Sequence, residues 1–432
     1  MKKYDSYKDS GIEWIGEIPS HWAVNKVKHN FSFKTGFTPP SGKSEYYEDG
    51  THVWINISDL QEKEISDSVN KITDKAIEDF KPEIVQKGSL LYSFKLSVGR
   101  VGFNTIDCYT NEAIFSINPD SSTNLNFFYY SLPDQILKNA NENIYGAKIL
   151  NQELIKNAYL VIPPTTEQTS IASFLDRKTS EIDEIIADKK RLLELYEEEK
   201  TAIINQAVTK GLDPNAPMKD SGIEWLGEIP EHWEVKKVKH VLKSLNSIRI
   251  PLSAEERGKM EVRKYDYYGA SGVIDKVEDY LFDEPLLLIG EDGANLVSRS
   301  SRLSFIAKGK YWVNNHAHIL KPTYGILEYY CELMELCDYS IFISGSAQPK
   351  LTSDNLMNIQ IIVPPFDEQM EIIHHLETGL IKINFKKART EELIELLTEY
   401  RRALISEAVT GKIKVTENCE NNKGASQYHQ DH

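Results

Sequence analysis

The sequence predicts an α/β (α+β) protein in which two variable domains are joined by two long helices that pair as an antiparallel coiled coil, with an internal pseudo-two-fold repeat. Three observations lead to this prediction. One opening segment occurs twice, and two long stretches without an internal proline carry a helical pattern of apolar residues. The segments between them contain short β-rich runs punctuated by glycine and serine.

The repeat is a duplicated frame around divergent content. Lys8 to His29 reads KDSGIEWIGEIPSHWAVNKVKH, and the copy from Lys219 to His240 differs at four positions. We call each copy an opening motif; the two are offset by 211 residues. Later matches are offset by 201, so the first variable region is longer by ten residues. These later matches are Leu160-Val-Ile-Pro-Pro164 with Ile361-Ile-Val-Pro-Pro365, Glu167-Gln168 with Glu368-Gln369, and Ala207-Val-Thr209 with Ala408-Val-Thr410.

The two long helices are predicted over residues 166–210 and 367–411. Each follows a Pro-Pro pair, and Gly211 and Gly411 supply the stops. Apolar residues recur three, four or seven apart, as in a coiled-coil seam. An alternative is that each helix packs only on its own domain. The predicted seam consists of Ile171, Leu175, Ile182, Ile185, Leu192, Tyr196 and Ile203 in the first helix, and Ile372, Leu376, Ile383, Leu393, Leu397, Tyr400 and Leu404 in the second.

The composition is that of a soluble globular protein. The 432 residues are 41% hydrophobic and 27% charged, and no apolar run reaches the length of a membrane span. The first residues lack the apolar stretch of a signal peptide, and the four cysteines show no CxxC spacing, so we expect a reducing, cytoplasmic location. The polar residues after Lys414 are expected to be disordered.

The charge is unevenly distributed. A net charge of −15 taken alone argues against binding to nucleic acid. Two segments are nevertheless basic. Val235 to Arg249 and Ser298 to Trp312 each contain lysine and arginine and no acidic residue. Local basic patches can bind phosphates, although such a patch can also be ordinary solvated surface.

No catalytic or metal-binding constellation is visible. Val363-Pro-Pro-Phe366 resembles the motif of amino-methylating enzymes, but valine cannot accept the required hydrogen bond, so the Pro-Pro pairs are read as strand-to-helix breaks. There is no phosphate-binding GxxxxGK[ST] loop and no GxGxxG turn. Gly290-Glu-Asp-Gly293 could hold a metal, although a plain turn is favoured. His21 and His232 are expected to pack or to form hydrogen bonds. We therefore predict a protein that is not an enzyme.

The variable segments carry residues suited to reading DNA. Glutamine can bind adenine N6 and N7, and arginine or lysine can bind guanine O6 and N7 in the major groove. Each candidate could instead belong to a surface turn. The predicted DNA-binding residues are Lys95, Arg100, Lys148, Arg249, Tyr267, Tyr268, Ser271, Asn295, Arg299, Arg302, Gln348 and Lys350.

In combination, these motifs resemble the specificity (S) subunit of type I restriction–modification systems. The resemblance covers nearly all of the chain. It is carried by the two opening motifs, the Pro-Pro…Glu-Gln pairs, the Ala-Val-Thr closes, Ile289-Gly-Glu-Asp-Gly-Ala294 and Gly345-Ser-Ala-Gln348. The first variable segment departs from the pattern, with Leu91-Tyr-Ser-Phe-Lys95 where the Gly-Glu-Asp-Gly turn would stand and Gly146-Ala-Lys148 without a glutamine.

The resemblance implies the following organisation. Target recognition domain 1 spans residues 1–164, spacer helix 1 spans 165–211, domain 2 spans 212–365, spacer helix 2 spans 366–412, and a polar tail spans 413–432. Each domain would read one half of a split, asymmetric double-stranded DNA site, and the helices would set the unread gap.

The resemblance also implies partners. Two methyltransferase subunits would dock on the helices, and translocase–nuclease subunits would join that core. The chain itself would hold no cofactor, and S-adenosylmethionine, ATP and Mg²⁺ would belong to the partners. The alternatives are the specificity partner of a fused methyltransferase–nuclease and a protein-only scaffold.

Overall fold

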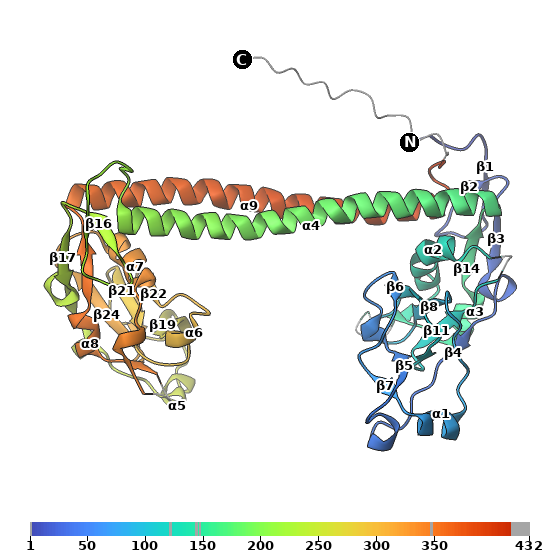
Figure 1. Cartoon of the computed structure of the whole chain (residues 1–432), viewed down its shortest axis with the longest axis horizontal. Helices are drawn as coiled ribbons and strands as arrows, with labels where there is room; N and C mark the ends of the chain where they lie inside the picture. The colour runs from blue at the N-terminus through green and yellow to red at the C-terminus, as the bar shows by residue number, and fades with distance from the viewer. Residues whose placement is uncertain (1, 121–122, 143–145, 147, 346–348, 416–432) are drawn as a thin grey trace, which may run out of the picture. The chain divides into compact units, whose positions relative to one another are not determined.

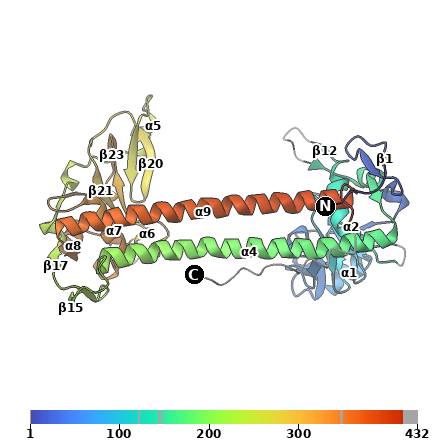
Figure 2. The ribbon, with the colours of Figure 1, turned by 90° about the horizontal axis from the view of Figure 1, so that it is seen from above.

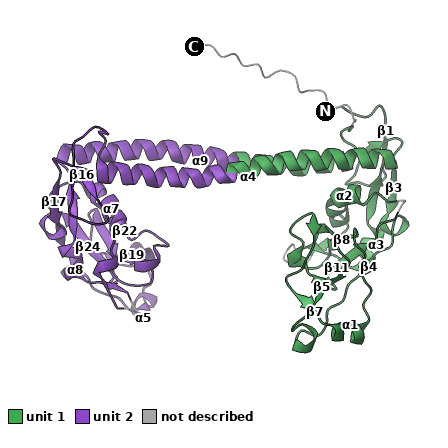
Figure 3. Cartoon of the chain, in the orientation of Figure 1, with its two compact units in different colours: residues 1–189, 393–432 green, residues 190–392 purple. Residues whose placement is uncertain are grey.

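The chain folds into two compact units. The structure, a computed structural model, describes residues 2–120, 123–142, 146, 148–345 and 349–415. Unit 1 contains residues 1–189 and 393–432, and unit 2 contains residues 190–392 (Figure 3). Each unit holds one opening motif, one variable segment and parts of both long helices. Each unit is therefore assembled from segments that are far apart in the sequence.

The two predicted long helices are present. α4 spans Thr165–Lys210 and α9 spans Phe366–Val409, and both begin directly after a Pro-Pro pair (Figure 1). Proline has no backbone N–H to continue a strand ladder and disfavours the helical conformation in the residue before it, so a Pro-Pro pair separates the strand that precedes it from the helix that follows. Within the described residues, neither these helices nor the shorter ones combine the length and apolar character that a membrane crossing requires.

In unit 1 the two helices pair in antiparallel sense. Leu175, near the start of α4, belongs to the same buried core as Leu404, near the end of α9. Further along, Arg401 forms an ion pair with Asp183 at 2.8 Å. The helix segments run side by side in both views (Figures 1 and 2).

Unit 2 contains the converse pairing. Val208, near the end of α4, shares a buried core with Ile372, near the start of α9. Lys387 forms an ion pair with Glu197. In each unit the beginning of one helix therefore packs on the end of the other. This confirms the antiparallel arrangement over separate packing of each helix.

The predicted seam is partly wrong. Ile185, Leu393 and Tyr400 are 43%, 39% and 49% exposed, whereas Ile186 packs against the core of unit 1. The reason is helical drift, because 3.6 residues per turn carry a strict three–four pattern gradually off the buried face. These three residues are therefore apolar side chains exposed on the helices.

The variable segment of unit 1 is built on small sheets. A five-stranded sheet has the order β4-β11-β8-β9-β6, and a three-stranded sheet has the order β10-β5-β7. The strands of the larger sheet are β4 (Lys34–Thr35), β11 (Ile114–Ile117), β8 (Leu90–Ser93), β9 (Val101–Asn104) and β6 (Glu64–Ile65). The smaller sheet contains β10 (Tyr109–Thr110), β5 (His52–Ile55) and β7 (Lys71–Ile72). Two-stranded pairs are β1 (Tyr7–Asp9) with β2 (Glu17–Pro19), β3 (Ala23–Lys26) with β14 (Tyr159–Ile162), and β12 (Asn141–Glu142) with β13 (Lys148–Ile149). The helices are α1 (Asp74–Phe80), α2 (Leu125–Leu137) and α3 (Gln152–Asn157).

Unit 2 repeats this topology. Its larger sheet has the order β18-β24-β21-β22, and its smaller sheet is centred on β19, which pairs antiparallel with β20 and parallel with β23. The larger sheet contains β18 (Leu242–Ser244), β24 (Ala317–Pro322), β21 (Leu286–Gly290) and β22 (Ser304–Ala307), and the smaller contains β19 (Tyr265–Gly269), β20 (Gly272–Val277) and β23 (Tyr311–Val313). The pairs are β15 (Met218–Asp220) with β16 (Glu228–Pro230), β17 (Glu234–Lys237) with β27 (Gln360–Val363), and β25 (Ile343–Ser344) with β26 (Lys350–Leu351). The helices are α5 (Ala254–Gly258), α6 (Asn295–Ser298), α7 (Leu327–Leu336) and α8 (Ser353–Asn358).

The opening motif is an anchor for the helices. In unit 1, Glu167 on α4 accepts hydrogen bonds from Tyr4 at 2.9 Å and Trp22 at 3.1 Å, and lies 2.6 Å from His21 Nε2. Burial would raise the pKa of Glu167, but its hydrogen bonds to His21, Trp22 and Tyr4 bring that pKa below its ordinary value. In unit 2, His232 Nε2 lies 2.7 Å from Glu368. The packing and hydrogen-bonding role predicted for both histidines is confirmed.

A lysine at each helix end completes the anchor. In unit 1, Lys412 donates to the carbonyl oxygens of Ile15 and Glu17. In unit 2, Lys210 donates to the carbonyls of Leu226 and Glu228, which are the corresponding residues of the second opening motif. The two lysines stand on opposite sides of the terminal glycine in the sequence.

Candidate nucleic-acid interface

Three loops of unit 2 meet at the end of strand β21. They are the β19–β20 turn (residues 270–271), the β21–β22 loop (residues 291–303) and the β25–β26 hairpin. A Cβ on Gly290 would lie 2.9 Å from the carbonyl oxygen of Ala270, so the turn approaches the strand at a distance that requires glycine. Gly293 N donates to Pro349 O at 3.1 Å. The predicted residues Ser271, Asn295 and Lys350 therefore lie on adjoining loops.

Glu291 is the charged centre of this loop cluster. Its carboxylate lies 2.6 Å from Arg249 and 3.2 Å from Lys350, and only 10% of its side chain is exposed. Burial would raise the pKa of Glu291, but the hydrogen bond from Arg249 and the neighbouring positive charges lower it below the ordinary value. Arg249 also donates to the carbonyl oxygens of Asn315 and Ala317. The hydrogen bonds of Arg249 are thus used to hold the loops together. Lys350, by contrast, has 49% of its side chain exposed.

Two histidines complete the cluster. His318 is fully buried between Asn246 Nδ2, at 2.9 Å from its Nδ1, and the carbonyl of Leu351, at 2.8 Å from its Nε2. Burial lowers the pKa of His318, so this ring is neutral at physiological pH. His316 Nδ1 lies 2.8 Å from Asp292 Oδ2. Both acids of the Gly-Glu-Asp-Gly turn are therefore in contact with basic side chains, Glu291 with Arg249 and Lys350 and Asp292 with His316. Throughout the described residues, there is no group of three or more His, Cys, Asp or Glu side chains placed to hold a metal ion.

The β21–β22 loop carries two exposed arginines that are anchored by α7. Arg302 forms an ion pair with Glu332 at 2.9 Å, and Arg299 donates to the carbonyl oxygen of Glu335. Arg299 lines a cavity of about 410 Å³ together with Val297 and Tyr339. Both guanidinium groups are held at the surface, with 47% of the Arg302 side chain exposed.

Asn295 stabilises the same loop from within. Its amide donates to Ser301 O at 3.0 Å and accepts from Ser301 N at 2.9 Å, which closes the loop on itself. Asn295 is predicted to bind DNA, but its side-chain amide is already hydrogen-bonded to the backbone of Ser301.

The two predicted tyrosines differ from expectation. Tyr267 is 1% exposed, its hydroxyl bonds to the backbone of Leu252, and the guanidinium of Arg257 lies 4.7 Å from its ring centroid. The prediction that Tyr267 contacts DNA is therefore wrong, because its ring is buried in the core. Tyr268 is half-buried and stacks on Phe305. Tyr267 and Tyr268 are neighbours at a register shift in β19, and only Tyr267 is fully buried, which a list of loop residues does not reveal. Gln348 lies outside the described residues.

In unit 1 the predicted residues lie on two elements. Lys95 is exposed on the β8–β9 loop (residues 94–100), and Arg100 closes that loop and donates to Ile57 O at 3.4 Å. Lys148 is on β13 and pairs with Glu142 of β12. The β8–β9 loop occupies the same topological place as the β21–β22 loop of unit 2.

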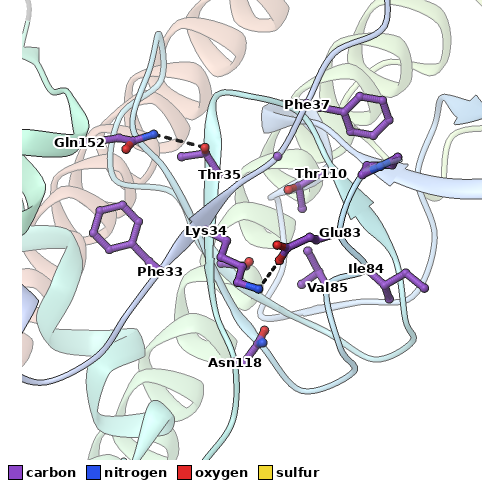
Figure 4. Close-up of a pocket in the computed structure, with 13 residues that line it drawn as sticks. Phe33, Lys34, Thr35, Phe37, Glu83, Ile84, Val85, Thr110, Asn118 and Gln152 are labelled. Atoms are coloured by element: carbon purple, nitrogen blue, oxygen red, sulfur yellow. Dashed lines mark hydrogen bonds and ion pairs between the residues drawn. The ribbon is translucent and has the colours of Figure 1, made fainter. Parts of the chain in front are cut away.

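Each unit also has a cavity along the opposite edge of its larger sheet. In unit 1, about 340 Å³ is lined by Lys34 and Thr35 of β4, and Figure 4 shows Lys34 directed toward Glu83 and Gln152 toward Thr35. In unit 2, about 490 Å³ is lined by Lys243 of β18 and by Lys321, which pairs with Glu284. These cavities contain none of the predicted DNA-binding residues.

Sequence reasoning missed the partners that hold the basic residues. Glu332 and Glu335 lie one helical turn apart on α7, and no motif connects them with the β21–β22 loop. Glu291 was visible in the Gly-Glu-Asp-Gly turn, and Arg249 in the basic segment before it. The pairing of the two could not be read because 42 residues separate them.

The comparisons with known proteins agree with this architecture. Residues 19–195 and 230–395 match the family described as type I restriction modification DNA specificity domain. The chain is 25% identical to the type I restriction enzyme MjaIX specificity subunit of Methanocaldococcus jannaschii, over 93% of this chain and 96% of that protein. It is 22% identical to the EcoprrI specificity subunit of Escherichia coli, over 84% and 86%.

Solved structures share the fold. A chain from a study of complex assembly and conformational transition of the type I R-M system superposes with a TM-score of 0.65 at 14% identity, covering 92% of this chain and 99% of that one. The HsdS subunit from Thermoanaerobacter tengcongensis gives 0.54 at 13% identity, covering 92% and 98%. The two matched segments span most of the sequence and fall one in each half of the repeat. The chain belongs to the type I restriction–modification DNA specificity family, the non-catalytic specificity subunits of these systems.

Proposed function

We propose that this chain reads a bipartite, asymmetric DNA sequence, with one half-site bound by each unit. The observation that carries the proposal is the contrast between frame and loops. The opening motifs make matching contacts in both units, whereas the loops that follow β8 and β21 occupy the same topological place with different side chains. A repeated scaffold with divergent, basic loops suits two different base sequences.

The outward apolar residues of the helices support docking of methyltransferase subunits. Leu396 of α9 is 55% exposed in unit 1, and its repeat counterpart Leu195 of α4 is 44% exposed in unit 2. Phe385 is 69% exposed. Exposed apolar residues gathered on one element are typical of protein–protein contacts. We propose two methyltransferase subunits, with translocase–nuclease subunits joining them, and S-adenosylmethionine, ATP and Mg²⁺ held by these partners. Action on genomic DNA would place the assembly in the cytoplasm.

Selection from a random duplex library with the full chain tests the proposal. The expected result is two short preferred sequences separated by a gap of fixed length, with affinity falling by a log–log salt slope of about −0.9 per neutralised phosphate. A selection without base preference, or an affinity that does not change with salt, would refute sequence reading.

Single substitutions assign the half-sites. Arg302→Ala should relax base preference only in the half-site of unit 2, and Arg100→Ala only in that of unit 1, by about 1–3 kcal/mol if each makes a bidentate base contact. Lys321→Ala, which removes an exposed lysine at the cavity of unit 2, is the matched control and should leave both preferences unchanged.

A further inference from the structure

The β8–β9 loop is held in one conformation by the buried residue Ser93. The Ser93 hydroxyl donates to Ser97 O at 2.6 Å and accepts from Arg100 N at 3.0 Å. Gly99 N donates to Ser93 O at 2.9 Å. The path of the loop is therefore set by the end of strand β8, and the side chains at its tip are not needed to form it.

Leu96 lies at this tip in a conformation that leucine rarely adopts. Its φ is +57°, in the left-handed region, and 93% of the residue is exposed. Glycine, asparagine or aspartate would satisfy this backbone at lower conformational cost. Burial does not offset the cost, because the side chain is in solvent. Strained residues of this kind cluster where proteins bind ligands.

The charged residues on the loop that carries Leu96 are all basic. Lys95 precedes it, Arg100 closes the loop, and no acidic residue occurs between Phe94 and Ile106. An apolar side chain between two cations matches the surface of a DNA major groove, in which the thymine C5-methyl is the apolar group and phosphates line both edges.

The corresponding loop of unit 2 shares part of this arrangement. Four non-glycine residues of the described chain have positive φ, and two of them, Leu96 and Arg299, lie on these corresponding loops. In unit 2 the positive φ of +51° belongs to Arg299, which caps the C-terminus of α6, and the exposed apolar residue is Val297, at 66%. A strained leucine exposed at the loop tip is therefore particular to unit 1.

We propose that the Leu96 side chain contacts the C5-methyl group of a thymine and so selects an A·T pair in the half-site of unit 1. The inference rests on the proposed function and adds a base type and an atom to it. Lys95 would hold a flanking phosphate beside the base contact proposed for Arg100, and the strained backbone would direct the leucine into the groove.

The test replaces thymine by deoxyuridine, which removes only the methyl group. With the selected duplex, each thymine of the half-site assigned to unit 1 is exchanged in turn, and the dissociation constant of the full chain is measured. One exchange should weaken binding about fourfold, the equivalent of one buried methyl group. Leu96→Ala should bind the thymine and deoxyuridine duplexes equally. Ile84→Ala, which shortens a 57% exposed apolar side chain lining the cavity at β4, should keep the fourfold ratio.

Two outcomes would overturn the inference. One is a half-site in which no exchange weakens binding; equal losses of the Leu96→Ala chain on both duplexes would then indicate a wedge between base steps. The other is a Leu96→Ala chain that retains the deoxyuridine penalty. If the full chain selects no sequence at all, the proposed function itself fails, and that result is distinct from these two.

Discussion

Arg249 and Glu291 are joined by a 2.6 Å ion pair of which only 16% and 10% of the side chains are exposed. The sequence alone predicts that Arg249 binds DNA, but in the structure its ion pair with Glu291 holds together the strand and loops of unit 2. The consequence for experiments is that loss of DNA binding in an Arg249 variant would not identify a DNA contact.

Arg249→Ala should destabilise unit 2 by about 3–5 kcal/mol, because it leaves the carboxylate of Glu291 buried without its main partner. Urea unfolding followed by the fluorescence of unit 2 tryptophans measures the change. Arg249→Met combined with Glu291→Gln should recover much of the loss. The exposed pair of Lys34 and Glu83 is the control, and Lys34→Ala should cost at most about 1 kcal/mol. Equal losses in the two single variants would contradict a structural role for Arg249.

His318 should make stability depend on pH. Because burial holds the pKa of His318 below its ordinary value of 6.5, the folded chain binds fewer protons than the unfolded chain once the pH falls below about 6.5. Its contribution to stability is therefore present above that pH and declines on acidification toward the lowered pKa. His318→Gln should flatten the unfolding free energy between pH 7 and 5. His29→Gln, at an exposed histidine of unit 1, is the control; a profile unchanged by His318→Gln would exclude this assignment.

Gly411 should tolerate no side chain. Its φ is +75°, and a Cβ would lie 2.4 Å from Pro19 Cδ and 2.9 Å from Trp22 Cζ3. Gly411→Ala should therefore cost more than the roughly 1–2 kcal/mol of left-handed strain alone. Gly11→Ala in the same unit isolates that strain, since its φ is +73° and a Cβ there would meet nothing within 4 Å. The melting temperatures of both variants measure the difference. Similar values would show that Pro19 and Trp22 move aside and that the close contact costs no stability.

The two glutamates of the anchors, Glu167 and Glu368, should contribute differently to the stability of their units. Glu167 accepts hydrogen bonds from Tyr4 and Trp22 as well as facing His21, whereas the indole nitrogen of Trp233 in unit 2 has no partner within the described structure. Glu167→Ala should therefore lower the stability of its unit more than Glu368→Ala does, by about 1–3 kcal/mol. Site-resolved hydrogen exchange in each unit measures this difference, and the reverse order would count against the anchor described above.

Shortening both long helices tests the gap between the half-sites. Deleting residues 182–188 and 383–389 removes two turns from each helix and keeps the apolar period of seven. The selected site should then have a shorter gap and unchanged half-sites. A changed half-site sequence would contradict separate roles for helices and loops.

The sequence predicts the parts of the fold that are fixed by local pattern. The long helices follow from apolar spacing, and their ends at Lys210 and Val409, one and two residues before the predicted glycines, follow from backbone preference. The seam is less predictable, and Ile185 is misplaced because a single residue of drift moves a side chain from the buried face to solvent. Local rules constrain helices strongly and their exact facing weakly.

The candidate site is less predictable because its side chains are held in place by partners that are distant in the sequence. Arg302 is positioned by Glu332, and the buried Tyr267 is held by the backbone of Leu252. The prediction of a recognition loop at Ser271, Asn295 and Lys350 identifies loops that do adjoin, but it does not separate residues that hold the loops from residues that are free to bind.

The order of Lys210-Gly211 and Gly411-Lys412 shows what the duplication has preserved. Both ammonium groups donate to the same two carbonyl positions of an opening motif, although one lysine precedes its glycine and the other follows it. The two halves of the chain therefore place an ammonium group at the same point of the anchor by two different residue orders. An alignment of the two halves that compares letters would score this junction as a mismatch, when chemically it is one of their closest correspondences.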